Sequence, residues 1–264
     1  MLKYQKESFR QSIKKLLPRS CIDIFHFLKY RPQRPQNFFI YQEVLRGKSG
    51  LEIGGPSMVF KIVLPIYQVV ANLDGVNFQD ETMWESQIQS GKTFKYFKNK
   101  IGKQFINDAT NLKDIKSDTY DFLISSNCLE HVANPIRALE EWMRVVKSQG
   151  NLLLVLPRKE SNFDHQRPIT KFEHILDDYH TKMSEHDLTH LDEILKLHDL
   201  SRDHASINKD YFKSRCLNNY HNRGLHHHVF DMPLIAEIFE YCKIDIINKH
   251  ASKYDYFIMG RLRK

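Results

Sequence analysis

Residues suited to ligand binding gather around one turn near residue 50. Glu52 precedes two glycines, Gly54 and Gly55, and an acidic residue, Asp74, follows the next short apolar segment. Glycines let the backbone approach a ligand closely, and a carboxylate at the end of the second strand can accept hydrogen bonds from both hydroxyls of a ribose. We therefore expect a nucleoside ligand. The turn lacks a third glycine and contains Pro56, so it does not match the G-x-G-x-x-G turn of dinucleotide sites.

A second group of reactive side chains lies between residues 161 and 203. On a helix that begins near Ser184, a rotation of about 100° per residue places Asp187, His190 and His198 on the same face as Ile194. Titratable groups on an apolar helix face must be paired or must line a cleft, because burying them alone is costly. We expect a substrate-side pocket rather than an inert surface, with these candidate catalytic residues: His165, His190, Asp164, Arg167, His174 and Asp187.

The same segment raises the question of a metal site. His186 and His190 are four residues apart, which permits two ligands on one helix face, but the glutamate of the H-E-x-x-H pattern is missing. A divalent metal held by Asp and His is an alternative way to activate a hydroxyl. The sequence favours a site without a metal ion.

Short apolar runs predict the strands that must position these groups. They lie at residues 50–53, 68–73, 103–107, 121–125 and 151–156, and none shows a clean alternation of apolar and polar residues. This is typical of strands buried on both faces of a parallel sheet. Asn134 and Pro135 predict the start of a helix between the last two strands. A helix over residues 233–242 and strands over 244–248 and 254–260 follow, and their short connector requires antiparallel pairing.

The domain organisation follows from these elements. Residues 1–45 predict an N-terminal helical segment, and residues 46–264 one α/β domain with a helical insertion at 160–224 on the substrate side. The N-terminus carries charge from its third residue and has no apolar stretch like that of a secretory signal, and no run is long enough for a transmembrane segment. We expect a cytoplasmic protein. The four cysteines contain no C-x-x-C pair, which suits free thiols.

Charge and composition limit the classes of protein and of binding partner to be considered. The chain has 264 residues, of which 41% are hydrophobic and 27% charged, and this excludes disordered and collagen-like classes. The net charge of +7 is dispersed, with its densest stretch at residues 92–103. We expect a solvated basic surface. The alternatives are an acidic partner, such as a phosphorylated or nucleotide-linked substrate, and an anionic membrane surface.

Four segments within residues 49–157 resemble the class I S-adenosylmethionine-dependent methyltransferases, in particular their type 11 subgroup. They are LEIGGPS, NLDGVNF, FINDATNL and YDFLISSNCLEHVANPIRALEEWMRVVKSQGNLLLVLP. The last is the most specific, with its S-x-x-L-E-H-V ending before a helix that starts with proline. The resemblance implies a Rossmann-like fold with a seven-stranded, mostly parallel sheet and an antiparallel last strand. It also implies S-adenosyl-L-methionine as the cofactor.

The resemblance assigns roles at the cofactor site. It implies that Glu52, Gly54 and Gly55 border the methionine part, with Ser57 beside them on a first helix that Pro65 shortens. The remaining roles are ribose binding by Asp74, adenine binding by Asp108 with Ala109 behind it, and closure of the pocket by Asn127 and His131. Turn capping is the competing role for Asp74 and Asp108, and a core position is the competing role for His131.

We expect methylation of a hydroxyl group, on a sugar or a cell-surface glycan precursor, with a histidine removing the proton. His165 is the first choice for that base and His190 the second. The expectation rests on the histidine-rich insertion, on missing amine-methylating and RNA-binding signatures, and on a contextual similarity to methyltransferases encoded near glycan genes. One alternative is an RNA or nucleotide methyltransferase that stacks bases on Phe94, Tyr96 and Phe97. Another is a non-catalytic subunit of a polysaccharide assembly complex.

Overall fold

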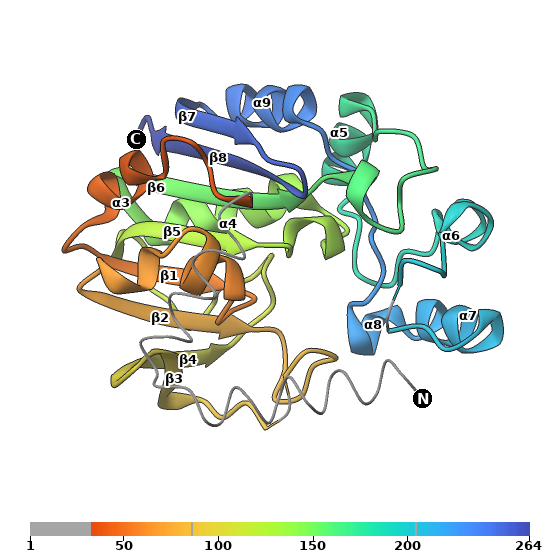
Figure 1. The fold of residues 1–264 in the computed structure, drawn as a ribbon, viewed down its shortest axis with the longest axis horizontal. Coiled ribbons are helices and arrows are strands. Elements are labelled where there is room, and N and C mark those ends of the chain that lie inside the picture. Colours follow the sequence, from red (N-terminus) through yellow and green to blue (C-terminus); the bar gives the residue numbers. More distant parts are fainter. Residues whose placement is uncertain (1–32, 86, 204) are drawn as a thin grey trace.

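The computed structural model describes residues 33–85, 87–203 and 205–264 (Figure 1). Most of the predicted N-terminal helical segment lies outside these residues. Its described part contains helix α3 (Phe38–Leu45), whose Tyr41 and Leu45 are fully buried.

One eight-stranded sheet organises the chain, in the order β3-β4-β2-β1-β5-β6-β8-β7. The strands are β1 (Ser49–Ile53), β2 (Asn72–Asn77), β3 (Gly91–Phe97), β4 (Lys100–Ile106), β5 (Tyr120–Ser126), β6 (Val146–Pro157), β7 (Ile244–Ala251) and β8 (Asp255–Leu262). Strands β4, β2, β1, β5 and β6 are parallel neighbours, and β8 lies antiparallel between β6 and β7. The predicted Rossmann-like sheet and its C-terminal hairpin are confirmed.

The eighth strand, which the sequence did not predict, comes from the basic stretch at residues 92–103. There β3 and β4 form an antiparallel hairpin at the edge of the sheet. Phe94 and Tyr96 point into the core and are 2% and 3% exposed, and their rings stack on each other. The two aromatic side chains are therefore unavailable for stacking on bases, which removes this support for the RNA alternative.

Apolar side chains cover both faces of the sheet, as the unalternating strand sequences predicted. Along β6, Leu152, Leu154 and Leu156 pack on one face, while Leu153 and Val155 pack on the other. The first face is covered by α4 (Pro135–Val145) and α9 (Met232–Tyr241), and the second by α3 with the short turns η2 (Val59–Val63) and η3 (Ile66–Gln68). The central strands are thus held rigidly between two layers.

Local sequence signals explain where α4 begins. The side chain of Asn134 accepts a hydrogen bond from the backbone N–H of Arg137 at 3.0 Å, and Pro135 occupies the first turn. The side chain of Asn134 also donates to the carbonyl of Asp178 at 2.9 Å. This cap therefore joins the sheet domain to the segment that follows β6.

That segment contains α5 (Phe172–His180), α6 (Leu191–Leu197), α7 (Lys209–Leu217) and α8 (Asn219–Asn222), which lie beyond one end of the strands in Figure 1. The predicted helix near Ser184 is wrong, because α6 begins only at Leu191. His190 is its N-cap and Asp187 lies in the preceding turn, so they do not share a helix face with Ile194. The short chain between α5 and α6 turns repeatedly instead, with the Asp187 carboxylate accepting a hydrogen bond from the backbone of Thr189 at 2.9 Å.

Two further expectations concern thiols and membranes. The three cysteines in the described part of the chain, Cys128, Cys216 and Cys242, are free. Within the same part of the chain, no helix is both long and apolar enough to cross a membrane.

Candidate active site

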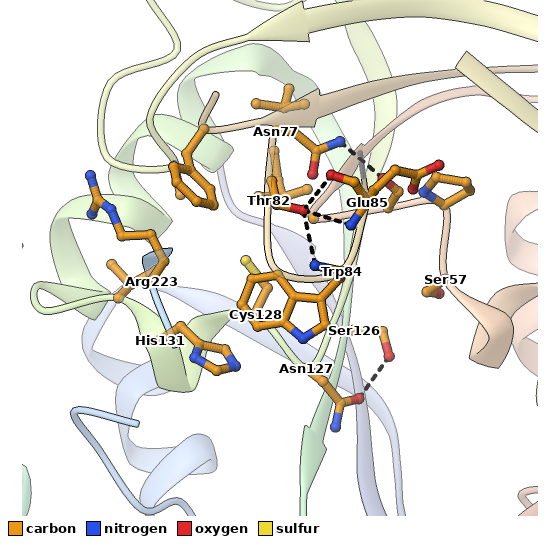
Figure 2. A pocket seen from close by; sticks show the side chains of 18 of the residues that line it. Ser57, Asn77, Thr82, Trp84, Glu85, Ser126, Asn127, Cys128, His131 and Arg223 are labelled. Carbon is orange, nitrogen blue, oxygen red and sulfur yellow. Dashed lines mark hydrogen bonds between the residues drawn. The ribbon is translucent and has the colours of Figure 1, made fainter. Parts of the chain in front are cut away.

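A cavity of about 420 Å³ lies at the carboxyl ends of β1, β2, β4 and β5 (Figure 2). Its wall includes the residues that directly follow these strands, among them Gly54, Phe78, Asn107 and Asn127. Small-molecule sites have volumes of roughly 300–1,000 Å³. Open α/β sheets bind ligands at this edge, where the loops after the parallel strands meet.

The loop after β1 approaches the cavity through its backbone. Gly54 has a φ of +76°, and a Cβ on Gly55 would lie 2.2 Å from the Cδ of Glu52. Both glycines therefore have a steric reason to be there. Gly54, Gly55 and Ser57 line the cavity, and their place beside the methionine part of the cofactor stays a prediction.

Glu52 supports this loop from beneath rather than lining the cavity. Its side chain is fully buried and accepts hydrogen bonds from the Tyr67 hydroxyl at 2.7 Å and from the backbone N–H of Ser57 at 3.1 Å. Burial raises the pKa of Glu52 to about 7, although both hydrogen bonds oppose the change. Its contribution to ligand binding is thus to position the glycine turn.

Asp74 is not at the end of its strand, contrary to the prediction. Strand β2 continues to Asn77, and Asp74 is its third residue. The carboxylate accepts hydrogen bonds from the Tyr120 hydroxyl and from the backbone N–H of Lys103, both at 2.7 Å. Asp74 does not line the cavity, and these bonds tie β2 to its neighbour β4 and to β5, which lies beyond β1. The cavity is instead reached by Asn77, whose side-chain amide donates to the carbonyl of Gly55 at 3.0 Å.

The loop after β4 contributes Asp108 and Ala109, both of which line the cavity, and their adenine role stays a prediction. One carboxylate oxygen of Asp108 accepts from the backbone N–H of Thr110 at 2.8 Å, and the other accepts from the guanidinium of Arg223 at 2.9 Å. Asp108 therefore caps its own turn and also anchors the segment after α8. The carbonyl of Ala109 accepts from the Trp142 ring N–H at 2.9 Å, which fixes the loop on α4.

The end of β5 contributes Asn127, Cys128 and His131. Asn127 has a φ of +51°, a conformation that asparagine adopts more readily than most residues, and it turns the chain toward the cavity. The Nδ1 atom of His131 lies 3.2 Å from the carbonyl oxygen of Leu225. Because a carbonyl only accepts, this contact requires the hydrogen on Nδ1 and leaves a lone pair on Nε2.

The pKa of His131 lies well below its usual range. Burial is the main cause, and the nearby rings of His226 and His227 add to it, whereas the carbonyl of Leu225 and the carboxylate of Asp164 oppose it. His131 is therefore neutral at neutral pH. Its ring contacts the Trp84 ring with a centroid distance of 5.2 Å.

A family profile described as a methyltransferase domain matches residues 18–204, which is more than half of the chain. The chain belongs to this methyltransferase-domain family. It is an S-adenosylmethionine-dependent methyltransferase, so the family, enzyme class and cofactor predicted from the sequence are confirmed.

The methyltransferase chain also resembles solved structures at low identity. One is a SAM-dependent methyltransferase from Aquifex aeolicus, with 14% identity, a TM-score of 0.45, and coverage of 96% of this chain and 97% of that chain. Another is an S-adenosylmethionine-dependent methyltransferase from Mesorhizobium loti, with 10% identity, a TM-score of 0.49, and coverage of 85% and 95%. Among curated proteins, none matches.

The cavity of this methyltransferase fits the cofactor in size and chemistry. The glycine turn offers the exposed backbone of Gly54, where a Cβ would lie 3.3 Å from the Cys128 side chain. Asn77 and Asp108 present amide and carboxylate groups at neighbouring strand ends. Trp84 adds a ring that is 61% exposed in the loop after β2. Polar groups at a few points of a mostly apolar wall are typical of small-molecule sites.

The six residues predicted to be catalytic do not line the cavity. The guanidinium of Arg167 is 1% exposed and is held by Asp164 at 3.1 Å, by Glu193 at 2.8 Å and by the carbonyl of His226. His165 pairs with Asp199 at 2.9 Å. These contacts organise the inserted segment. Asp164 reaches toward the cavity through its 2.5 Å contact with His226, whose ring meets that of His131 at a centroid distance of 4.5 Å.

The remaining predicted residues lie farther along the insertion. His174 and His190 contact each other through their Nε2 atoms at 2.9 Å, and the Asp187 carboxylate lies 3.5 Å from the ring of His227. Spacing alone predicted a shared cleft for His190 and Asp187, but the turns between α5 and α6 direct their side chains to different partners.

Sequence reasoning missed several residues that line the cavity, among them Asn77, Trp84, Glu85, Glu185 and Arg223. Glu185 accepts from the backbone N–H of Ala133 at 2.9 Å and pairs with Arg223 at 2.8 Å. The loop at residues 78–85 is part of the long connection between Asp74 and Asp108, and that unusual length was the available signal. No local pattern distinguishes Arg223 or Glu185 from other charged residues of the insertion.

Proposed function

We propose that this methyltransferase transfers the methyl group to a hydroxyl, on a sugar or a cell-surface glycan precursor, and that His131 removes the hydroxyl proton. The observation that supports this most is the fixed tautomer of His131. Its Nδ1 faces the carbonyl of Leu225, so the Nε2 lone pair is free, and the residue lies on the cavity wall. A neutral imidazole with one free lone pair is suited to general-base work near neutral pH.

Behind His131, the carboxylate of Asp164 favours its brief protonation, whereas the His226 ring opposes it. The His226 ring lies between His131 and the carboxylate of Asp164, which is bonded to His226 Nδ1 at 2.5 Å. The pKa of Asp164 is lowered to about 2 by its contacts with His226 and Arg167, which outweigh its burial, so the carboxylate is charged. A negative charge at this position stabilises a positive charge on His131 as it takes the proton. The base role thus moves from His165 and His190 to His131, with Asp164 as a positioning residue.

When bound, S-adenosylmethionine would supply a methyl group on a positively charged sulfur for transfer to the acceptor oxygen. The chain holds the two partners in reach of each other, and such positioning supplies much of the rate acceleration. Gly54 and Gly55 provide backbone close to the cofactor. Since Asp74 lies in the strand interior, we propose that Asn77 and Glu85 form the hydrogen bonds with the ribose hydroxyls instead.

The wall around His131 favours a sugar ring as the acceptor. Sugars have apolar C–H faces and polar edges, and the exposed Trp84 ring offers an apolar surface directly beside His131. Glu185 and Arg223 on the same wall offer an acceptor and donors for hydroxyl groups. The net charge of +7 suits an acceptor that carries phosphate or a nucleotide.

The test is a methyl-transfer assay with labelled cofactor and separate pools of nucleotide sugars, polysaccharide and RNA. We expect label on oxygen in a carbohydrate pool. His131→Ala should lower turnover by roughly 10² to 10⁴-fold, with the cofactor dissociation constant changed less than about threefold. His165→Ala, whose partner is Asp199, is the matched control and should keep its turnover. Label on nitrogen or on RNA contradicts the acceptor, and full turnover by His131→Ala contradicts the base.

A further inference from the structure

Three histidines of the insertion and its flank converge at one point outside the cavity, and the Asp178 carboxylate contacts two of them. The Nε2 atom of His174 lies 2.9 Å from Nε2 of His190 and 3.3 Å from Oδ2 of Asp178. The Nε2 atom of His228 lies 2.9 Å from the same carboxylate oxygen. One nitrogen from each of the three histidines lies within 4.8 Å of the other two. These residues come from α5, from the N-cap of α6 and from the segment before α9, so folding alone brings them together.

We propose that His174, His190, His228 and Asp178 bind one divalent transition-metal ion, with Zn²⁺ the best match. Imidazole nitrogens with one carboxylate oxygen form a donor set that suits Zn²⁺. A tetrahedral ion with bonds of about 2.0–2.1 Å separates neighbouring ligand atoms by about 3.3 Å. Three contacts in the cluster, at 2.9, 2.9 and 3.3 Å, are close to this value. The three histidine nitrogens lie within 4.8 Å of one another, so side-chain movements complete the site.

Hydrogen bonds among these four side chains satisfy only some of their lone pairs. One proton can join His174 to His190, and another can join His228 to Asp178, since each Nε2 carries at most one hydrogen. The two pairs are then held beside each other without a bond between them. A single cation accepts all four lone pairs at once, and it also compensates the charge of the Asp178 carboxylate, whose side chain is 4% exposed.

The position of the cluster gives the ion a structural role. Glu185, which lines the active-site cavity, lies in the loop between Asp178 and His190. The backbone of Asp178 is bonded to the cap of α4 through Asn134. An ion would therefore join α5 and α6 to the chain that enters α9 and hold the Glu185 wall in place. The side chain of His174 is 37% exposed, which gives an ion access from solvent.

Metal binding can be measured on the full chain without any activity assay. The protein, purified without a metal-affinity step and treated with chelator, is titrated with Zn²⁺ and separately with Co²⁺. We expect one ion per chain and visible Co²⁺ bands typical of four-coordinate nitrogen and oxygen ligands. Binding only to the native state raises the melting temperature, on the order of 5 °C at a free Zn²⁺ concentration 100 times the dissociation constant.

Variants locate the ion. His174→Ala and His190→Ala should weaken Zn²⁺ binding by about 100-fold or more and abolish the cobalt bands. His180→Ala, an exposed histidine at the end of the same helix α5, is the matched control and should bind as the wild type does. Circular dichroism and cofactor binding report whether each variant is folded, and His174→Gln is the milder substitution if the alanine variant is not. Absence of stoichiometric binding by the wild type, or unchanged binding by folded His174 and His190 variants, overturns the proposal.

Discussion

The buried carboxyl group of Glu52 makes the stability of this enzyme depend on pH in a way that can be measured. The folded state raises the pKa of Glu52 from 4.5 to about 7, mainly because burial disfavours the charged form. A group whose pKa is raised by folding binds its proton more tightly in the folded state. Its contribution to stability is complete below pH 4.5 and is lost as the pH rises through about 7.

The size of the effect follows from the shift. One pKa unit corresponds to about 1.4 kcal/mol, so the shift of Glu52 corresponds to roughly 3 kcal/mol in total. About 1 kcal/mol of this is already lost at pH 5. Between pH 5 and pH 8, Glu52 should therefore lower the free energy of unfolding by about 2 to 3 kcal/mol. Because Glu52 is fully buried, solvent screening does not reduce this value much.

Glu52→Gln removes the titration while keeping the shape. The glutamine oxygen can still accept from the N–H of Ser57, and its amide can donate to the Tyr67 hydroxyl. Urea unfolding of both proteins at pH 5 and pH 8 gives four free energies. From pH 5 to pH 8, the free energy of unfolding of the variant should rise by about 2 to 3 kcal/mol relative to that of the wild type. Any effect of the substitution that does not depend on pH cancels in this comparison.

Glu237→Gln, at an exposed position of α9, controls for the loss of a carboxylate and should show no such gain. If the difference between wild type and Glu52→Gln is equal at pH 5 and pH 8 within about 0.5 kcal/mol, a value below the effect worked out above, the raised pKa is refuted. A gain in the opposite direction would mean that the bonds from Tyr67 and Ser57 outweigh burial.

Two further predictions concern the cofactor loops. Gly55→Ala places a Cβ 2.2 Å from the Cδ of Glu52. It should therefore destabilise the fold by roughly 1 to 3 kcal/mol, measured by urea unfolding, and weaken cofactor binding, measured by calorimetry. Unchanged affinity would show that the loop does not contact the cofactor. Asp74→Ala should lower the free energy of unfolding by about 1 to 3 kcal/mol and leave cofactor affinity nearly unchanged. Glu85→Ala should weaken cofactor affinity and leave stability unchanged. The reverse result would mean that Asp74 binds the ribose.

The sequence predicted the elements whose signals are local. The apolar runs at β5 and β6 identified strands buried on both faces, and the Asn134 cap fixed the start of α4 within a residue. The same reasoning failed at β2. Residues 68–73 are apolar enough for a strand, but Ile66–Gln68 forms a short helical turn and the strand begins only at Asn72. This shift of a few residues moved Asp74 from the expected strand end to the strand interior, because an apolar run does not specify its own register.

The contacts within the inserted segment could not be predicted from residue spacing, for a different reason. Its histidines and acids find partners far away in sequence: Arg167 pairs with Glu193, and His165 pairs with Asp199. Such partners are set by the path of the chain after folding, and the helical rotation assumed around Ser184 did not exist. His131, by contrast, was identified from a motif at the end of a strand, where the sheet itself fixes its place.

The apolar core of the insertion explains why so many charges are buried there. In the part of the insertion that the structure describes, the separate cluster of buried side chains consists of Ile194, Phe212, Cys216 and Leu225, while Ile175 packs into the core of the sheet domain. So small a core cannot by itself fix the path of the 65 residues expected at 160–224. Buried ion pairs require exact partners and so favour one arrangement over others, at a cost in desolvation. The charged residues of the insertion therefore set the wall on which Glu185 and Arg223 face the cavity, whereas His131, the base in the function we propose, lies on the sheet domain.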